Sequence, residues 1–217
     1  MVHSQSSDPV VRDPARAPRR SNLARSAYHA LNAVVVVALA DLLLPDARWR
    51  VAISGVGLAA AWSMEVARRL DPRVNARLMT LFRQVAHPHE VDHVNSATWY
   101  TTAIFLLSVV PPLWAGVAGL LVLGFGDPLA GIVGRAWGRH RFADGRSVEG
   151  STAFVAGGFA VAWGWLTFAH PEVAHPGWAA LAAAVGGAAG ELFSRRVDDN
   201  LLIPLAASAS AWLVSGW

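Results

Sequence analysis

The apolar residues of this chain gather into long runs and not into short amphipathic ones. Such runs are near the length that a helix needs to cross a bilayer, although several of them are short. We therefore expect an all-α, polytopic membrane protein with about seven transmembrane helices. The candidate spans are residues 28–44, 51–65, 97–110, 113–126, 151–169, 178–193 and 200–217.

Residues 1–27 lack this pattern and carry five arginines among prolines and serines, which predicts a disordered basic arm. The arm also resembles the start of a signal peptide, but the further spans favour a retained first span. We expect residues 28–217 to form a single transmembrane domain. In this interpretation the cytoplasmic loops 66–96, 127–150 and 194–199 form the site.

Arginine placement predicts the orientation. With the N-terminus in the cytoplasm, sixteen arginines fall on inner segments, and only Arg48 and Arg50 fall on outer loops. This asymmetry is typical of proteins with cytoplasmic basic loops. We therefore expect a protein of the inner (cytoplasmic) membrane whose active site faces the cytoplasm.

The polar stretch 66–96 has apolar residues at roughly helical spacing, which predicts an amphipathic helix on the inner membrane surface. Its histidines, His87, His89 and His93, do not have the spacing of a helical zinc pair, so we do not expect zinc there.

Composition excludes some chemistry. Cysteine is absent, which rules out disulfides and thiolate metal sites. All eighteen basic residues are arginine. We attribute the pI near 10.5 to basic loops that face anionic lipid, and we expect no nucleic-acid partner.

A glycine-rich stretch follows the fourth segment. Asp127 and Pro128 have the pattern of a helix N-cap and first residue, so we expect a new helix to begin there. Gly131, Gly134 and Gly138 would share one face of that helix with Asp127. A face so bare admits either a phosphate chain or a neighbouring helix, and both readings stay open.

The next residues favour the phosphate reading. Arginine side chains suit phosphate oxygens, and carboxylates suit the magnesium that accompanies nucleotides. The residues that carry these groups are Arg135, Arg139, Arg141, Arg146, Ser147 and Glu149.

Acidic residues cluster at the expected cytoplasmic ends of the spans, which suggests a shared cation site. They are Glu65, Glu90, Asp92, Asp127, Glu149, Glu191, Asp198 and Asp199. Glu65 also has the spacing of a salt bridge with Arg68 or Arg69, and Glu191 with Arg195.

Two further positions carry polar groups next to a span. Asn200 is placed to cap the last helix, which would leave Asp198 and Asp199 free for metal or substrate. His29, near the start of the first span, is either a proton acceptor, a donor to lipid phosphate or a simple polar anchor.

These motifs resemble a known family. Gly-Asp127-Pro-Leu-Ala130, Gly134, Gly138-Arg-His140 and Arg146-Ser-Val-Glu149-Gly150-Ser151 are similar to the signature of the CTP-dependent lipid-alcohol kinases, namely dolichol kinase, phytol kinase and the yeast-type diacylglycerol kinase. Glu191 with Asp198-Asp-Asn200-Leu-Leu-Ile-Pro204 resembles their C-terminal motif. The family usually has lysine where Arg146 stands.

The resemblance implies a kinase that transfers the γ-phosphate of a nucleoside triphosphate, CTP, to a polyprenol, a phytol-like isoprenoid or diacylglycerol. We expect Asp127, Asp198 and Asp199 to bind Mg²⁺, with Glu149 as a further catalytic residue. The expected nucleotide-binding residues are Gly134, Gly138, Arg139, Arg146, Ser147, Gly150 and Asn200. The expected substrate-binding residues, on weaker matches, are His29, Glu65, Arg68, Glu90 and Glu191.

Two alternatives remain at this stage. A related group, the phosphatidate cytidylyltransferases, shares the Gly-Asp and Glu-Gly portions but ends in a histidine–glycine and Asp-Arg pattern that this sequence lacks. A transporter would place its charges near the membrane midplane and often show repeated halves, whereas these acids cluster at one surface.

Overall fold

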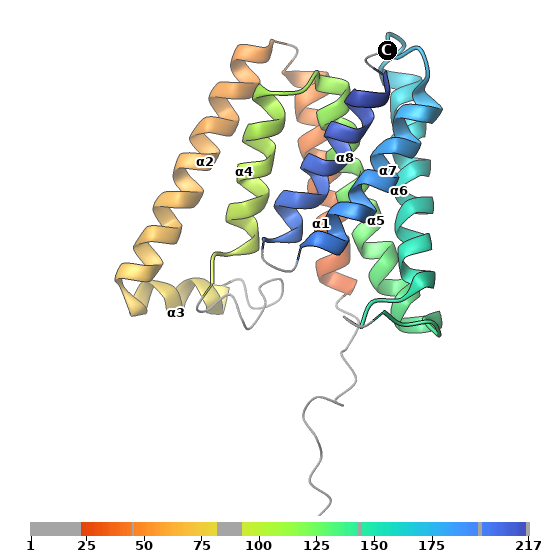
Figure 1. The fold of residues 1–217 in the computed structure, drawn as a ribbon. Coiled ribbons are helices and arrows are strands. Elements are labelled where there is room, and N and C mark those ends of the chain that lie inside the picture. The colour runs from red at the N-terminus through yellow and green to blue at the C-terminus, as the bar shows by residue number, and fades with distance from the viewer. Residues whose placement is uncertain (1–22, 45, 82–92, 143–144, 195–196, 216–217) are drawn as a thin grey trace, which may run out of the picture.

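The computed structural model describes residues 23–44, 46–81, 93–142, 145–194 and 197–215, and these form a helical bundle (Figure 1). The elements are α1 (Leu23–Ala38), the π-helix η2 (Leu39–Leu43), α2 (Ala47–Leu70), α3 (Pro72–Leu81), α4 (Ser96–Val109), α5 (Leu113–Trp137), α6 (Val148–Ala169), α7 (Pro176–Phe193) and α8 (Asp199–Ser215). Each of the seven apolar segments coincides with a helix, so the predicted all-α class is confirmed for the described residues. The predicted arm lies largely outside them.

Three of the described helical segments are long and apolar enough to cross a membrane: Ser26–Leu43, Leu113–Trp137 and Val148–Ala169. The helix Ser96–Val109 is apolar but shorter. The structure thus supports a membrane protein, while the number of spans and their orientation remain predictions.

Helix α5 is the centre of the bundle. It packs against α1, α6, α7 and α8, and its residues from Ala115 to Gly124 are all buried. Small residues permit this packing, because a Cβ at Gly119 would collide with the carbonyl oxygen of Pro204 in α8. Likewise, a Cβ at Gly124 would collide with Ala33 in α1.

The prediction of a helix start at Asp127 is wrong. Helix α5 continues through this position, with Pro128 in its interior, and ends at Trp137. Pro128 has no N–H to donate to the carbonyl of Gly124, but one lost bond does not stop a helix that is packed on four sides. The segment 127–137 is therefore helix and not loop.

The stretch 66–96 also differs from the prediction of one surface helix. Helix α2 extends to Leu70, and a break at Asp71, which precedes Pro72, starts the separate helix α3. Residues 82–92, with Glu90, Asp92, His87 and His89, lie outside the described residues.

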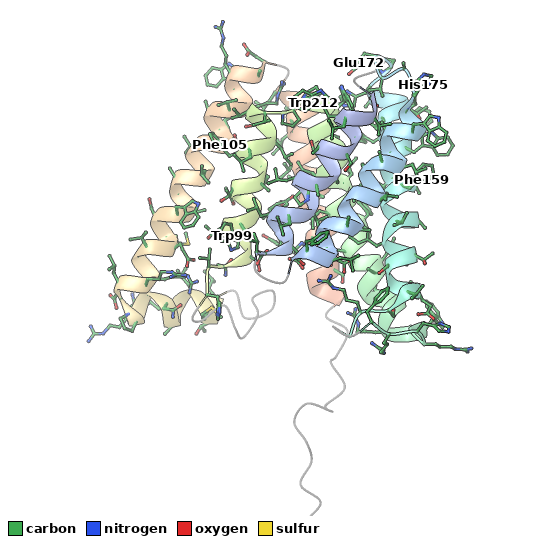
Figure 2. All side chains as sticks on the ribbon, in the orientation of Figure 1. Trp99, Phe105, Phe159, Glu172, His175 and Trp212 are labelled. Carbon is green, nitrogen blue, oxygen red and sulfur yellow. The ribbon has the colours of Figure 1, made fainter. Side chains whose placement is uncertain are left out.

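The bundle has two ends. We call the lower end in Figure 1 the site end: it holds the start of α1, helix α3, the end of α5 and the starts of α6 and α8. The opposite, far end holds Glu172 and His175, which are labelled in Figure 2.

Candidate functional site

The two acidic motifs lie at the same end of the bundle. Helices α5 and α8 touch at Gly119 and Pro204. From there, Asp127 lies eight residues further along α5, or about 12 Å, and Asp199 lies five residues back along α8, or about 8 Å. Since the helices run in opposite directions, both acids reach the site end (Figure 1).

Asp198 begins α8. Its carbonyl oxygen accepts the N–H groups of Leu201 and Leu202, and its Oδ1 accepts the N–H of Asn200 at 3.0 Å. Asp198 is therefore the N-cap, and the expectation that Asn200 caps this helix and leaves both acids free is wrong. The carboxylate of Asp198 reaches the N–H two residues later, as N-cap side chains do.

Asn200 is 2% exposed and joins the two acids. Its Nδ2 donates to Asp198 Oδ1 at 2.8 Å and to Asp199 Oδ1 at 3.1 Å. The other carboxylate oxygen of Asp198 accepts the hydroxyl of Ser96 in α4 at 3.0 Å. Asn200 and Ser96 thus orient the carboxylates of the acid pair.

Arg146 connects the segment before α6 to the end of α7. It donates to the carbonyl oxygen of Glu191 and, at 3.1 Å, to Ser194 Oγ, and its Nε lies 3.5 Å from Glu191 Oε1. Glu191 therefore contacts Arg146, while the alternative partner Arg195 lies outside the described residues. An arginine fork makes these contacts together, which a lysine cannot do.

Glu149 lies in the first turn of α6 and pairs with His140. Its Oε1 is 2.8 Å from His140 Nδ1, and both carboxylate oxygens accept the N–H of His140 at 3.3–3.4 Å. Arg139 next to it is exposed. Glu149 thus holds the turn after α5 in place beside a solvent-exposed arginine.

The glycine face of α5 is filled by protein. A Cβ at Gly134 would lie 3.0 Å from Ser147 Oγ, and a Cβ at Gly138 would lie 2.7 Å from the same atom. Gly150 is equally close to Ala130 and Ser147. Ser147 itself is buried and caps α6 by accepting the N–H of Gly150 at 3.1 Å. These contacts are therefore the ones expected if the glycines serve helix packing. A role of these residues in nucleotide binding stays a prediction.

Glu65 and Arg68 form a buried pair at the site end of α2. Two hydrogen bonds of 2.8 and 2.9 Å join them, and their side chains are 2% and 5% exposed. Arg69 also donates to Glu65, at 2.7 Å, which confirms the predicted salt bridge. Arg68 further donates to Asn75 in α3 and to the carbonyl oxygen of His93, so it holds α3 and the segment before α4 against α2.

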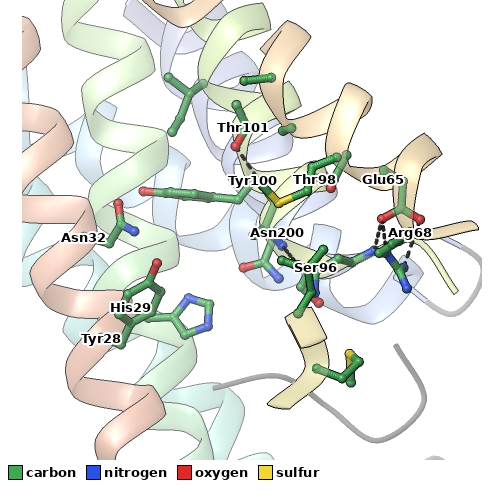
Figure 3. Close-up of a pocket in the computed structure, with 18 residues that line it drawn as sticks. Tyr28, His29, Asn32, Glu65, Arg68, Ser96, Thr98, Tyr100, Thr101 and Asn200 are labelled. Atoms are coloured by element: carbon green, nitrogen blue, oxygen red, sulfur yellow. Dashed lines mark hydrogen bonds and ion pairs between the residues drawn. The ribbon is translucent and has the colours of Figure 1, made fainter. Parts of the chain in front are cut away.

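A cavity of about 430 Å³ lies beside this pair, between α1, α2, α3 and α4, with Asn200 of α8 at its edge (Figure 3). Ala60, Ala61, Met64, Leu78, Met79 and Ile104 supply apolar walls. Four of the predicted site residues line it: His29, Glu65, Arg68 and Asn200. A space with both apolar walls and polar groups suits a lipid with a polar head.

Sequence reasoning gave no role to the other polar residues of this cavity, which are Tyr28, Asn32, Asn95, Ser96, Thr98, Tyr100 and Thr101. Most of them lie in the stretch 95–101, where polar and apolar residues are mixed, so no single one stands out from its neighbours. One feature of the sequence could have pointed to Tyr100. The chain has only two tyrosines, and both line the cavity.

A metal site is not preformed in the described residues, where no three His, Cys, Asp or Glu side chains group closely enough to hold an ion. Mg²⁺ in nucleotide sites usually has one or two protein carboxylates, with phosphates and water completing its shell. Asp127 and the Asp198–Asp199 pair, at the same end of the bundle, fit an ion that arrives with a nucleotide.

Known proteins resemble this chain. It is 34% identical to the phytol kinase of Synechocystis over 128 residues, which are 55% of this chain and 54% of that enzyme, so the match spans about half of the relative. It is 25% identical to CTP-dependent diacylglycerol kinase 1 of Schizosaccharomyces pombe over 170 residues, 73% of this chain and 78% of that enzyme. No family model and no solved structure matches the chain. The two relatives confirm the resemblance to the CTP-dependent lipid kinases.

Proposed function

We propose that this protein is a membrane-embedded kinase that transfers the γ-phosphate of CTP to a lipid alcohol. The observation that carries the proposal is the position of Asn200, which lines the lipid-sized cavity and also binds Asp198 and Asp199. An acceptor and a phosphate donor can therefore meet at one place. The similarity to phytol kinase and to CTP-dependent diacylglycerol kinase 1 supports the same reaction.

In the proposed reaction, the hydroxyl oxygen of the lipid forms a bond to the γ-phosphorus. The bond from that phosphorus to the β–γ bridging oxygen breaks, CDP leaves with the electron pair, and the hydroxyl proton passes to a carboxylate of the Asp198–Asp199 pair. Catalysis of this kind needs mainly positioning and charge neutralisation. Mg²⁺ held by Asp127, Asp198 and Asp199 would neutralise phosphate charge.

The arginines supply the remaining positive charge. Exposed Arg139 lies next to the turn that Glu149 holds, and Arg146 is fixed to the end of α7. We assign both to the phosphates of the nucleotide, with the backbone near Gly134, Gly138 and Gly150 beside them. The acceptor approaches from the cavity side, where His29, Glu65 and Arg68 lie.

We also propose that the chain crosses the inner membrane about seven times with its N-terminus and the site end in the cytoplasm. The sixteen arginines of the inner segments support this orientation. The phosphate donor is a cytoplasmic solute, and its site must be reached from that side.

The test is phosphate transfer by the purified protein in lipid vesicles, with γ-labelled CTP and long-chain alcohols. Asp127→Ala and Asp199→Ala should each lower kcat by at least about a hundredfold, because each removes charge stabilisation at the transferred group. Glu172→Ala, an exposed acid at the far end, is the control and should keep normal activity. Release of pyrophosphate instead of CDP would show a cytidylyltransferase, and normal activity of the Asp127 variant would refute the assignment.

A further inference from the structure

The hydroxyl of Tyr100 is an unusual feature of the cavity. It is buried and has no hydrogen-bond partner among the described residues. A buried hydroxyl without a partner is costly, so such groups normally bind another protein group, water or a ligand. Tyr100 extends across the cavity toward α1, where Asn32 and His29 lie (Figure 3).

The position of Tyr100 connects the cavity to the acid pair. Tyr100 follows Ser96 by four residues in α4, so their side chains lie on the same face of the helix. Ser96 donates its hydroxyl to Asp198, and both Ser96 and Tyr100 line the cavity. Tyr100 therefore begins about one helical turn along α4 from Ser96, the residue that contacts the proposed phosphate-handling pair.

The cavity walls define what Tyr100 would bind. Ala60 and Ala61 of α2 and Ile104 of α4 offer no polar side-chain atoms, so they suit a hydrocarbon chain. At about 430 Å³, the cavity is near the small end of the usual range of ligand sites, about 300–1,000 Å³. This size suits one chain and its hydroxyl better than a glycerol backbone that carries two chains.

We propose that this cavity binds the head of a single-chain lipid alcohol and that Tyr100 recognises its hydroxyl. The inference rests on the proposed kinase function and names the acceptor class. A tyrosine hydroxyl both donates and accepts, as an alcohol does, so one bond satisfies both groups. Tyr100 is a substrate-binding and specificity-determining residue in this role, which nothing in the sequence motifs assigns to it.

Tyr100→Phe tests the proposal because it removes only the hydroxyl. Loss of one such hydrogen bond should raise the KM for phytol about three- to tenfold in vesicles of phosphatidylcholine, with the KM for CTP unchanged. Phytol should also raise the unfolding temperature of the nucleotide-free protein less in this variant than in the wild type. The unfolding temperature without lipid should not fall, because the lost group has no partner in the protein.

Trp62→Phe is the matched control. Trp62 joins α2 to α4 through a hydrogen bond of 3.2 Å to Thr102, and it does not line the cavity. This variant should lose a little thermal stability and keep its KM for phytol. The opposite pattern, with Tyr100→Phe less stable and normal in lipid binding, would overturn the proposal and give Tyr100 a structural role.

Two further comparisons keep this inference separate from the kinase proposal. If phytol stabilises the nucleotide-free protein through Tyr100 but no phosphate is transferred from CTP, the kinase proposal fails and the lipid site stands. If transfer occurs but Tyr100→Phe binds phytol normally, the lipid site fails alone. Equal dependence on Tyr100 for dioleoylglycerol would overturn the preference for one chain.

Discussion

His170 is buried at the far end of the bundle, just after α6. Its Nε2 lies 3.0 Å from Asp41 Oδ2, and its Nδ1 lies 2.8 Å from Glu172 Oε1. Trp165 also donates to Asp41, at 2.6 Å. The bond to Asp41 raises the pKa of His170 above its ordinary value, although burial opposes the rise, and the bond to Glu172 adds to it. The folded state thus prefers the charged imidazolium.

This preference makes stability depend on pH. The stabilisation is complete below about pH 6.5, the ordinary pKa of histidine, and is lost as pH rises through the raised pKa of the folded state. We expect the unfolding temperature in detergent to decline over this range. Asp41→Asn should flatten the decline and remove about 1.5–3 kcal/mol of stability at low pH.

Asp46→Asn serves as the control for this pH series. Asp46 also lies at the far end, where it caps α2 by accepting the N–H of Arg48. Because asparagine is an equally good N-cap, this variant should keep the stability and the pH dependence of the wild type. Parallel pH curves for Asp41→Asn and the wild type would contradict the role given to His170.

The contacts of a single residue were predictable where its partners lie close to it in the chain. The Glu65 and Arg68 pair follows from a spacing of three within one helix. The sequence analysis assigned the cap of the last helix to Asn200, whereas Asp198 makes the capping bond in the structure. The buried hydroxyl of Tyr100 depends on how α4 faces α1, which local spacing does not encode.

At the scale of elements, the glycines at the end of α5 lie against the start of α6. Substituting them tests whether they serve helix packing or phosphate binding. Gly138→Ala would place a Cβ 2.7 Å from Ser147 Oγ and 2.8 Å from Ser147 Cβ. We expect overpacking to cost about 1–3 kcal/mol of stability, measured as a lower unfolding temperature.

Gly164→Ala is the matched control, because a Cβ there meets nothing within 4 Å and the residue lies inside α6. It should be neutral or gain up to about 1 kcal/mol from helix propensity. If Gly138→Ala instead keeps its stability and only raises the KM for CTP, the glycine face serves the nucleotide and not the helix contact.

The elements show where a local rule fails. Asp127 followed by Pro128 is a good helix start, yet α5 continues through it. Capping preferences favour a start by about 1 kcal/mol, whereas α5 contacts five other helices along its length. The lengths of the apolar runs predicted the helices well, because the burial of apolar residues is what determines these helices.

For the whole molecule, orientation is the main prediction. The chain contains no cysteine, so a single introduced cysteine reports one position. Arg139→Cys at the site end should react with a membrane-impermeant maleimide only after cells are permeabilised. Glu172→Cys at the far end should react in intact cells, because the arginine-rich end faces the cytoplasm. Exchanged labelling patterns would invert the topology and contradict the cytoplasmic site.

The location of Asp127 and Asp199 at the same end is a property of the whole bundle. Sequence suggested it through the positions of acids at span ends, but the close contact of Gly119 with Pro204 is what aligns the two helices. That contact joins residues far apart in the chain, so no local pattern contains it.

The short helix α4 has a consequence for the surrounding lipid. Its 14 residues extend about 21 Å, while the hydrocarbon layer of a bilayer is about 30 Å thick. In the proposed topology, in which α4 crosses the bilayer, thinning of the bilayer around this helix would accommodate its short length. Because α4 forms one wall of the cavity, the thinned patch would bring the headgroup layer down toward the entrance, and a lipid would travel a shorter distance from the leaflet into the protein.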